Sequence, residues 1–143
     1  MLFRSKPVGT LTDEERRVLV EHRIERAKEA QEDARIAFTH LRLTNTVNRC
    51  YYAMFYMVSA LALLDGFTSS KHKQMLGWFN RTYIASRHLD VHLKDILAYA
   101  FDSRDDGDYQ DWKTFEHDEV QQLCTDTDEF VRALEKFIRA RLP

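Results

Sequence analysis

The chain is 143 residues long, with 21 Lys and Arg residues, 23 Asp and Glu residues and a formal net charge of −2. This length suits one domain, large enough to bury a core without disulfides or a structural metal ion. The nearly balanced charge excludes a general electrostatic attraction to nucleic acid or to anionic lipid.

The scarcity of glycine and proline favours long helices. There are four glycines and two prolines, and both prolines lie near the ends of the chain, so little interrupts a helix. Cys50 and Cys124 are two isolated cysteines, which make neither a disulfide framework nor a zinc site. The residues before Pro7 contain no apolar signal core, so we expect a cytoplasmic protein.

Residues 1–11 are predicted to form a flexible leader and residues 12–143 a single helical domain. Thr12 and Glu15 have the spacing of a capping box, which starts the first helix. This helix is expected to run to about Leu43 with an alanine-rich apolar stripe. Its arginines and lysines alternate with glutamates, which is typical of a solvated face.

The second helix organises the rest of the chain. Residues 44–46 are predicted to break the chain before it, with Asn45 or Thr46 as its cap. The stretch from Cys50 to Leu64 is apolar nearly all round, so protein must enclose it. We expect it to be too short and too aromatic for a membrane span. Gly66 is expected to end it in a left-handed conformation.

Further helices are predicted at residues 71–84, 90–107 and 116–141. Asp90 is expected to cap the second of these, and residues 108–113 should form a loop. Short connections between helices of this length favour an antiparallel bundle. The sequence therefore predicts an all-α fold, an antiparallel four- to five-helix bundle.

Three motifs resemble the HEPN family of small prokaryotic helical domains. They are Asn48-Arg49 with Tyr51-Tyr52-Ala53-Met54-Phe55, then Lys71-His72, then Arg104 with Asp108-Tyr109. They occur in the family's order and span most of the chain. The resemblance implies a HEPN-like bundle that pairs as a homodimer. Tyr52, Phe55 and Tyr56 exceed the aromatic surface that one small bundle can cover, so they are the predicted dimer interface.

The resemblance also indicates where a catalytic site would lie. HEPN ribonucleases carry an Arg followed, after four to six residues, by a His that acts as acid or base. The Arg at this position is Arg104, but Tyr109, Gln110 and Asp111 occupy the three places where the His would stand. Arg–His pairs of similar spacing occur only away from this position. We therefore predict no catalytic residue, no cofactor and no metal ion.

Arg104, Asp108, Tyr109 and His72 remain the candidate functional residues. The favoured interpretation of Arg104 is an ion pair with a neighbouring aspartate, which would anchor the following loop; a working site built from these residues is the alternative. His72 stands at a helix start, where a hydrogen-bonded structural histidine is favoured. His88 and His92 are four residues apart, but without a nearby carboxylate or cysteine pattern they are weak metal ligands.

Residues 102–129 contain eleven carboxylates and only two cations, which disfavours RNA as a ligand. The resemblance then implies an interaction module: a non-hydrolytic partner of a minimal nucleotidyltransferase in a two-protein, toxin–antitoxin-like system. The alternative is a divergent HEPN endoribonuclease toxin that cleaves RNA without metal. No membrane association is expected.

Overall fold

The computed structural model describes the backbone of residues 7–109 and 114–142 and the side chains of residues 7–104 and 114–142. Its elements are a 3-10 turn η2 (Val8–Thr10), α1 (Asp13–Thr39), α2 (Leu43–Leu64), α3 (His72–Phe79), a π-helical turn η3 (Asn80–Ile84), α4 (Val91–Tyr109) and α5 (His117–Arg141). The described residues contain no strand. The predicted all-α fold is confirmed.

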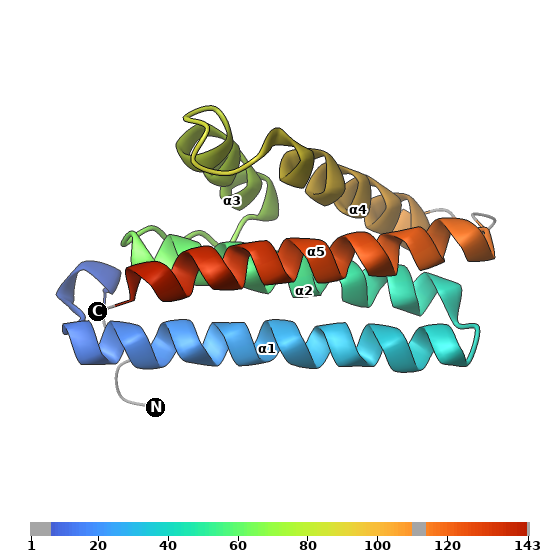
Figure 1. Ribbon diagram of the computed structural model, residues 1–143, viewed down its shortest axis with the longest axis horizontal. Coiled ribbons are helices and arrows are strands. Elements are labelled where there is room, and N and C mark those ends of the chain that lie inside the picture. Colours follow the sequence, from blue (N-terminus) through green and yellow to red (C-terminus); the bar gives the residue numbers. More distant parts are fainter. Residues whose placement is uncertain (1–6, 110–113, 143) are drawn as a thin grey trace.

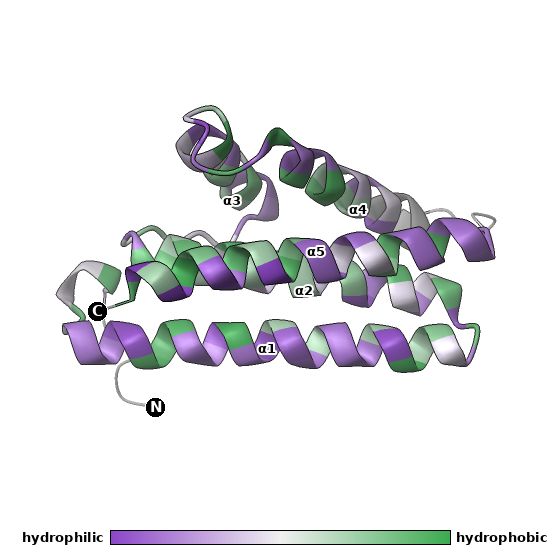
Figure 2. Ribbon diagram, in the orientation of Figure 1, coloured by the Kyte–Doolittle hydropathy of each residue, from purple (hydrophilic) through white to green (hydrophobic). Residues whose placement is uncertain are grey.

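The helix α2 is the centre of the bundle. Figure 1 shows α1, α2 and α5 side by side along the long axis, with α1 antiparallel to the other two. The helices α3 and α4 pack on α2 from another side, and α2 contacts all four other α-helices. It is also the most apolar helix in Figure 2, whereas α1 alternates between polar and apolar residues.

The burial of α2 agrees with its composition. Its fully buried large side chains include Tyr51, Met54, Met57 and Leu61. With 22 residues, α2 is long and apolar enough to cross a membrane by length and composition, so the expectation that this stretch is too short was wrong. However, 67% of its most apolar window is buried by the other helices, which is typical of a core helix.

The predicted capping box begins α1. The Thr12 hydroxyl accepts a hydrogen bond from the Glu15 backbone N–H at 3.1 Å, and Glu15 accepts one from the Thr12 N–H at 2.9 Å. The buried alanines of α1 are spaced to lie against α2, which allows the two helices to approach closely; they are Ala27, Ala30, Ala34 and Ala37. Within the range predicted as a leader, Val8–Thr10 form a 3-10 turn and Leu11 is buried.

The break between α1 and α2 lies earlier than predicted. It falls at residues 40–42, where Leu41 has a left-handed φ of 58°. Thr46 does not cap α2, because its hydroxyl donates to the Arg42 carbonyl at 2.8 Å from inside the helix. This bond to the preceding turn satisfies a threonine without ending the helix, so the polar run at 44–46 was a misleading signal.

Several other helix ends follow the sequence signals. Gly66 has a φ of 80°, and the Phe67 N–H bonds back to the Ala62 carbonyl at 2.8 Å, which is the expected left-handed cap. The Asp90 carboxylate accepts from the His92 N–H at 2.8 Å and caps α4. The loop predicted at 108–113 cannot begin at residue 108, because α4 continues to Tyr109.

Candidate functional site

Two of the candidate residues meet around a buried tyrosine. We call Tyr51, Phe55, His72, Phe101 and Arg104 the Tyr51 cluster. The Tyr51 hydroxyl and His72 Nδ1 are 2.7 Å apart and share a hydrogen bond. The His72 ring stacks on Phe55, with centroids 4.1 Å apart and an angle of 14° between the planes. The cluster thus joins the start of α3 to α2.

Arg104 reaches the same tyrosine from α4. Its Cζ atom lies 4.9 Å from the Tyr51 ring centroid and 5.4 Å from that of Phe101. Both distances are within the range of a cation–π contact. The aspartates proposed as its ion-pair partners, Asp105, Asp106 and Asp108, have side chains outside the described residues. The observed contacts of Arg104 therefore fasten α4 to α2 through aromatic rings.

Burial governs the protonation of the cluster. Desolvation raises the pKa of Tyr51 well above its ordinary value, and the nearby Arg104 charge offsets this only in part. Tyr51 is therefore a neutral phenol. Desolvation, followed by the Arg104 charge, lowers the pKa of His72 below 6.5, so its imidazole is neutral at pH 7. A neutral imidazole beside a guanidinium is a combination that can transfer protons and stabilise negative charge.

For the remaining predicted site residues, Asp108 and Tyr109, only the backbone is described. Asp108 and Tyr109 belong to the last turn of α4, but their side chains lie outside the described residues, as does Trp112. Sequence analysis placed His72 and Arg104 together in the alternative working site, but it did not include Tyr51 among the candidate residues. The family motifs contain Tyr51, His72 and Arg104, which was a signal that the three residues could act together. Their separation along the chain did not show that their side chains are in contact.

The predicted interface residues lie together on α2. Tyr52, Phe55 and Tyr56, which we call the aromatic face, are all partly buried. Their rings contact one another, with centroids 6.0–6.4 Å apart. Arg49 lies over Tyr52 at 5.1 Å and Arg26 over Tyr56 at 5.0 Å. These cations cover part of the aromatic surface, and whether a second copy covers the rest stays a prediction.

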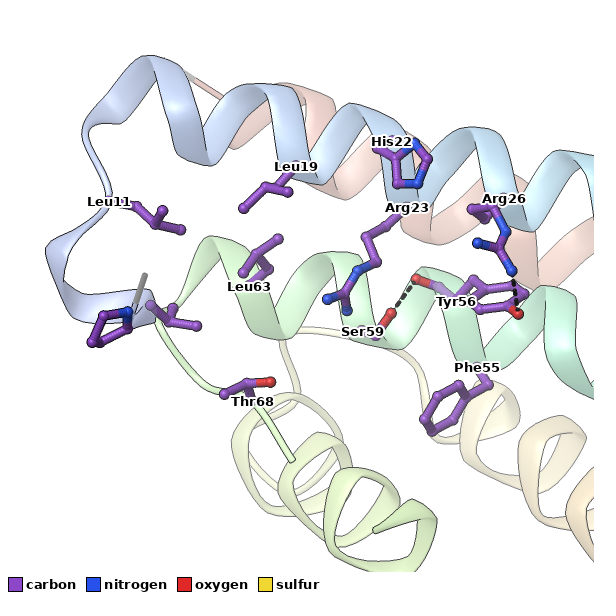
Figure 3. A pocket seen from close by; sticks show the side chains of 12 residues that line it. Leu11, Leu19, His22, Arg23, Arg26, Phe55, Tyr56, Ser59, Leu63 and Thr68 are labelled. Atoms are coloured by element: carbon purple, nitrogen blue, oxygen red, sulfur yellow. Dashed lines mark hydrogen bonds between the residues drawn. The ribbon is translucent and has the colours of Figure 1, made fainter. Parts of the chain in front are cut away.

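A pocket of about 550 Å³ opens beside the aromatic face (Figure 3). Phe55 and Tyr56 belong to its lining, Leu11, Leu19 and Leu63 make it apolar at one end, and Arg23 and Arg26 contribute guanidinium groups from α1. Sequence analysis missed the pocket because its lining comes from four separate stretches of the chain. It also assigned the arginines of α1 to a solvated face.

Side chains from other helices bind some of the carboxylates in the acidic residues 102–129. Asp128 accepts hydrogen bonds from Gln31 at 2.6 Å and from Arg35 at 3.3 Å, both on α1. His92 lies 3.3 Å from Glu129 and gains a carboxylate partner that sequence analysis did not find. In the part of the chain that is described, no three His, Cys, Asp or Glu residues are grouped to hold a metal ion.

Comparison with known proteins agrees with this architecture. A sequence model of the HEPN domain matches residues 20–137, and the chain therefore belongs to the HEPN family. A protein of Thermotoga maritima named "UPF0332 protein" is 36% identical over 124 residues, which cover 87% of this chain and 94% of that protein. A protein of Methanocaldococcus jannaschii named "Putative toxin MJ0142" is 28% identical over 119 residues, covering 83% of this chain and 81% of that protein. A second protein of that organism, "Putative toxin MJ0605", is 25% identical over 116 residues, covering 81% and 86%.

Proposed function

We propose that this chain is the HEPN component of a two-protein, toxin–antitoxin-like system. In this proposal it forms a homodimer, binds a small nucleotidyltransferase and does not itself hydrolyse RNA. Membership of the HEPN family and the toxin names of two relatives support the two-protein context. The molecular role is argued from the site.

The observation that carries the proposal is the environment of Arg104. Its guanidinium lies over the rings of Tyr51 and Phe101, and the sequence has no His at positions 109–111, where four to six intervening residues would place it. Loss of a positioned acid or base typically removes a 10²–10⁴-fold contribution to rate. A guanidinium that lies over two aromatic rings, without that partner, supports a structural role for Arg104.

The partner surface is proposed to lie at the end of α4 and in the residues that follow it. Tyr109 and Trp112 stand there among acidic residues. Aromatic side chains supply contact area at low entropic cost, and an acidic surround favours a basic partner. The aromatic face on α2 is a separate surface, and the proposal assigns it to the second copy of the chain.

Co-purification of the chain with the product of a neighbouring nucleotidyltransferase gene tests this proposal. The Tyr109→Ala, Trp112→Ala double variant should recover much less partner than the wild type. Tyr99→Ala is the matched control, because it removes an exposed tyrosine from another part of α4. Equal recovery by the double variant, or no nucleotidyltransferase with the wild type, would exclude this surface.

A metal-independent endoribonuclease is the second candidate, and two contacts favour it. His72 and Arg104 both contact Tyr51, so the fold supplies an imidazole near the arginine although the motif histidine is absent. His72 is neutral at pH 7 because its pKa is lowered, which suits a general base. In this case the wild type would cleave RNA, and both His72→Gln and Arg104→Met would abolish cleavage. Exposed His40→Gln is the control and should cleave RNA as the wild type does.

A further inference from the structure

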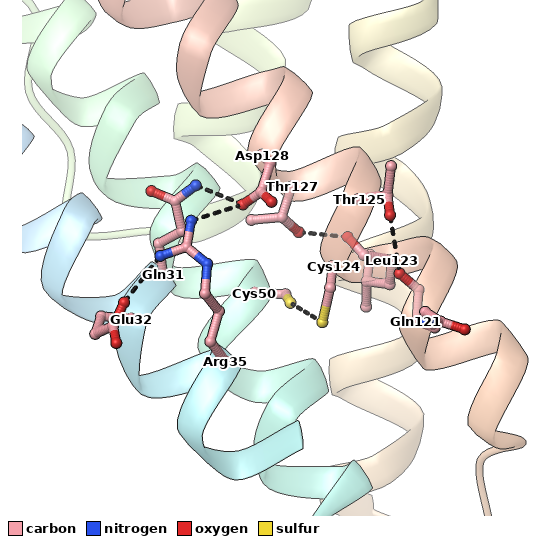
Figure 4. A network of polar contacts seen from close by, with 10 residues as sticks. All are labelled: Gln31, Glu32, Arg35, Cys50, Gln121, Leu123, Cys124, Thr125, Thr127 and Asp128. Atoms are coloured by element: carbon pink, nitrogen blue, oxygen red, sulfur yellow. Dashed lines mark hydrogen bonds and ion pairs between the residues drawn. The ribbon is translucent and has the colours of Figure 1, made fainter. Parts of the chain in front are cut away.

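The two cysteines, 74 residues apart in sequence, meet between α2 and α5. The Sγ atoms of Cys50 and Cys124 are 4.0 Å apart (Figure 4). Both cysteines are free thiols. Cys50 is fully buried on α2, whereas Cys124 on α5 is only partly buried. Disulfide sulfurs lie about 2.05 Å apart, so closing this gap requires an approach of about 2 Å by rotation of the side chains and adjustment of the helices.

The surroundings give the two thiols different reactivities. A hydrogen bond with Cys50 is the largest influence on the pKa of Cys124 and lowers it. Partial burial and the negative charge of Asp128 oppose this shift, and the positive charge of Arg35 adds a smaller lowering effect. The hydrogen bond with Cys124 and burial raise the pKa of Cys50. Arg35 is held near the pair by Asp128 at 3.3 Å and by Glu32 at 2.9 Å (Figure 4). The more accessible cysteine is therefore also the more reactive one, since the thiolate is the nucleophile.

We propose that Cys50 and Cys124 are an oxidation site at which a hydroperoxide forms a reversible disulfide between α2 and α5. Cys124 reacts first: its thiolate sulfur attacks the O–O bond of hydrogen peroxide and becomes a sulfenic acid, while the released hydroxide takes a proton and leaves as water. The Cys50 sulfur then attacks the Cys124 sulfur and displaces its hydroxyl group, which leaves as water with the proton of Cys50. Two thiols lose two electrons and two protons, and one peroxide becomes two waters.

The order of reaction follows from exposure. Peroxide needs to reach only Cys124. Buried Cys50 reacts in the second step with the Cys124 sulfur, which already lies beside it. A thiol reductant reverses the step by exchange, so in a reducing compartment the disulfide would be transient. The bond would tie α5 to the core helix and oppose their separation, since it cross-links segments distant in sequence. This inference does not depend on the proposed function.

Oxidation of the folded protein with hydrogen peroxide tests the inference. The wild type should lose both free thiols, stay monomeric on a non-reducing denaturing gel and yield a Cys50–Cys124 linked peptide that lacks two hydrogen atoms. Reduction with dithiothreitol should restore both thiols. Peptide mapping separates this product from methionine sulfoxide.

Two conservative variants check the roles. Cys50→Ser should accumulate a Cys124 sulfenic acid that dimedone traps, because no second thiol is present to resolve it. Cys124→Ser should leave Cys50 reacting more slowly than Cys124 does in Cys50→Ser, by about tenfold or more. Circular dichroism verifies that both variants fold. Retention of both thiols in the wild type under conditions that oxidise Cys124 in Cys50→Ser would overturn the inference, as would a disulfide formed only between molecules.

Discussion

Replacement of Arg104 by Met tests whether this arginine stabilises the fold. Methionine keeps an unbranched apolar stem but removes the charge that faces the rings of Tyr51 and Phe101, at 4.9 and 5.4 Å. A cation–π contact contributes about 0.5–1 kcal/mol at an exposed site and about 2 kcal/mol when it is desolvated. Tyr51 is fully buried and Arg104 partly buried, so the two contacts together should lower the free energy of unfolding by about 1–2 kcal/mol on replacement.

Urea denaturation followed by far-ultraviolet circular dichroism measures this loss. Exposed Arg132→Met is the matched control and should change the free energy of unfolding by less than about 0.5 kcal/mol. A cycle with Phe101→Leu isolates one of the contacts and should give a coupling of about 0.5–1 kcal/mol. If Arg104→Met is as stable as the wild type and the coupling is zero, the structural interpretation of Arg104 is refuted.

Three further predictions follow from burial, protonation and the aromatic face. Because Met54 is fully buried, Met54→Ala should lower the free energy of unfolding by about 2–5 kcal/mol. The control Met54→Leu should lower it by less than about 1.5 kcal/mol. Equal stability of both variants in urea would show that the core is misplaced. The folded-state pKa of His72 lies below 6.5, so the unfolded chain binds a proton at a higher pH than the folded chain does, and the free energy of unfolding falls as the pH drops through and below 6.5. His72→Gln should weaken this pH dependence in urea melts from pH 7.5 to 5. An unchanged dependence of the unfolding free energy on pH would contradict the prediction. Light scattering of the wild type should give about twice the monomer mass of 17.0 kDa. Tyr52→Glu should shift the protein toward the monomer. A wild-type mass near 17 kDa at micromolar concentration would exclude the homodimer.

Much of the fold could be predicted because single residues control helix ends. The Thr12–Glu15 capping box, the Gly66 left-handed cap and the Asp90 cap each depend on local hydrogen bonding that the sequence specifies. Thr46 was mistaken for a cap because a threonine hydroxyl can bond either to an exposed N–H or to the preceding turn. The choice depended on burial of Thr46 against neighbouring helices, and local sequence does not encode this.

The site was less predictable, because it depends on contacts between distant segments. His72 and Arg104 were recognised as candidates, but Tyr51, which joins them, was indistinguishable from other core aromatics. Cys50 and Cys124 were described as isolated on the basis of their separation in sequence, although the packing of α2 on α5 brings them to 4.0 Å. Sequence patterns indicate which face of a helix is buried, but not which buried residues on two helices meet.

Reconstitution of the two-protein complex tests the central claim most directly. The purified chain is mixed at micromolar concentration with the small nucleotidyltransferase that the proposal expects to be encoded beside it. Size-exclusion chromatography with light scattering then gives the mass of each species. The account predicts a single species heavier than the homodimer that contains both proteins, and its loss with the Tyr109→Ala, Trp112→Ala variant. Two separate peaks with the masses of the individual proteins would contradict the account.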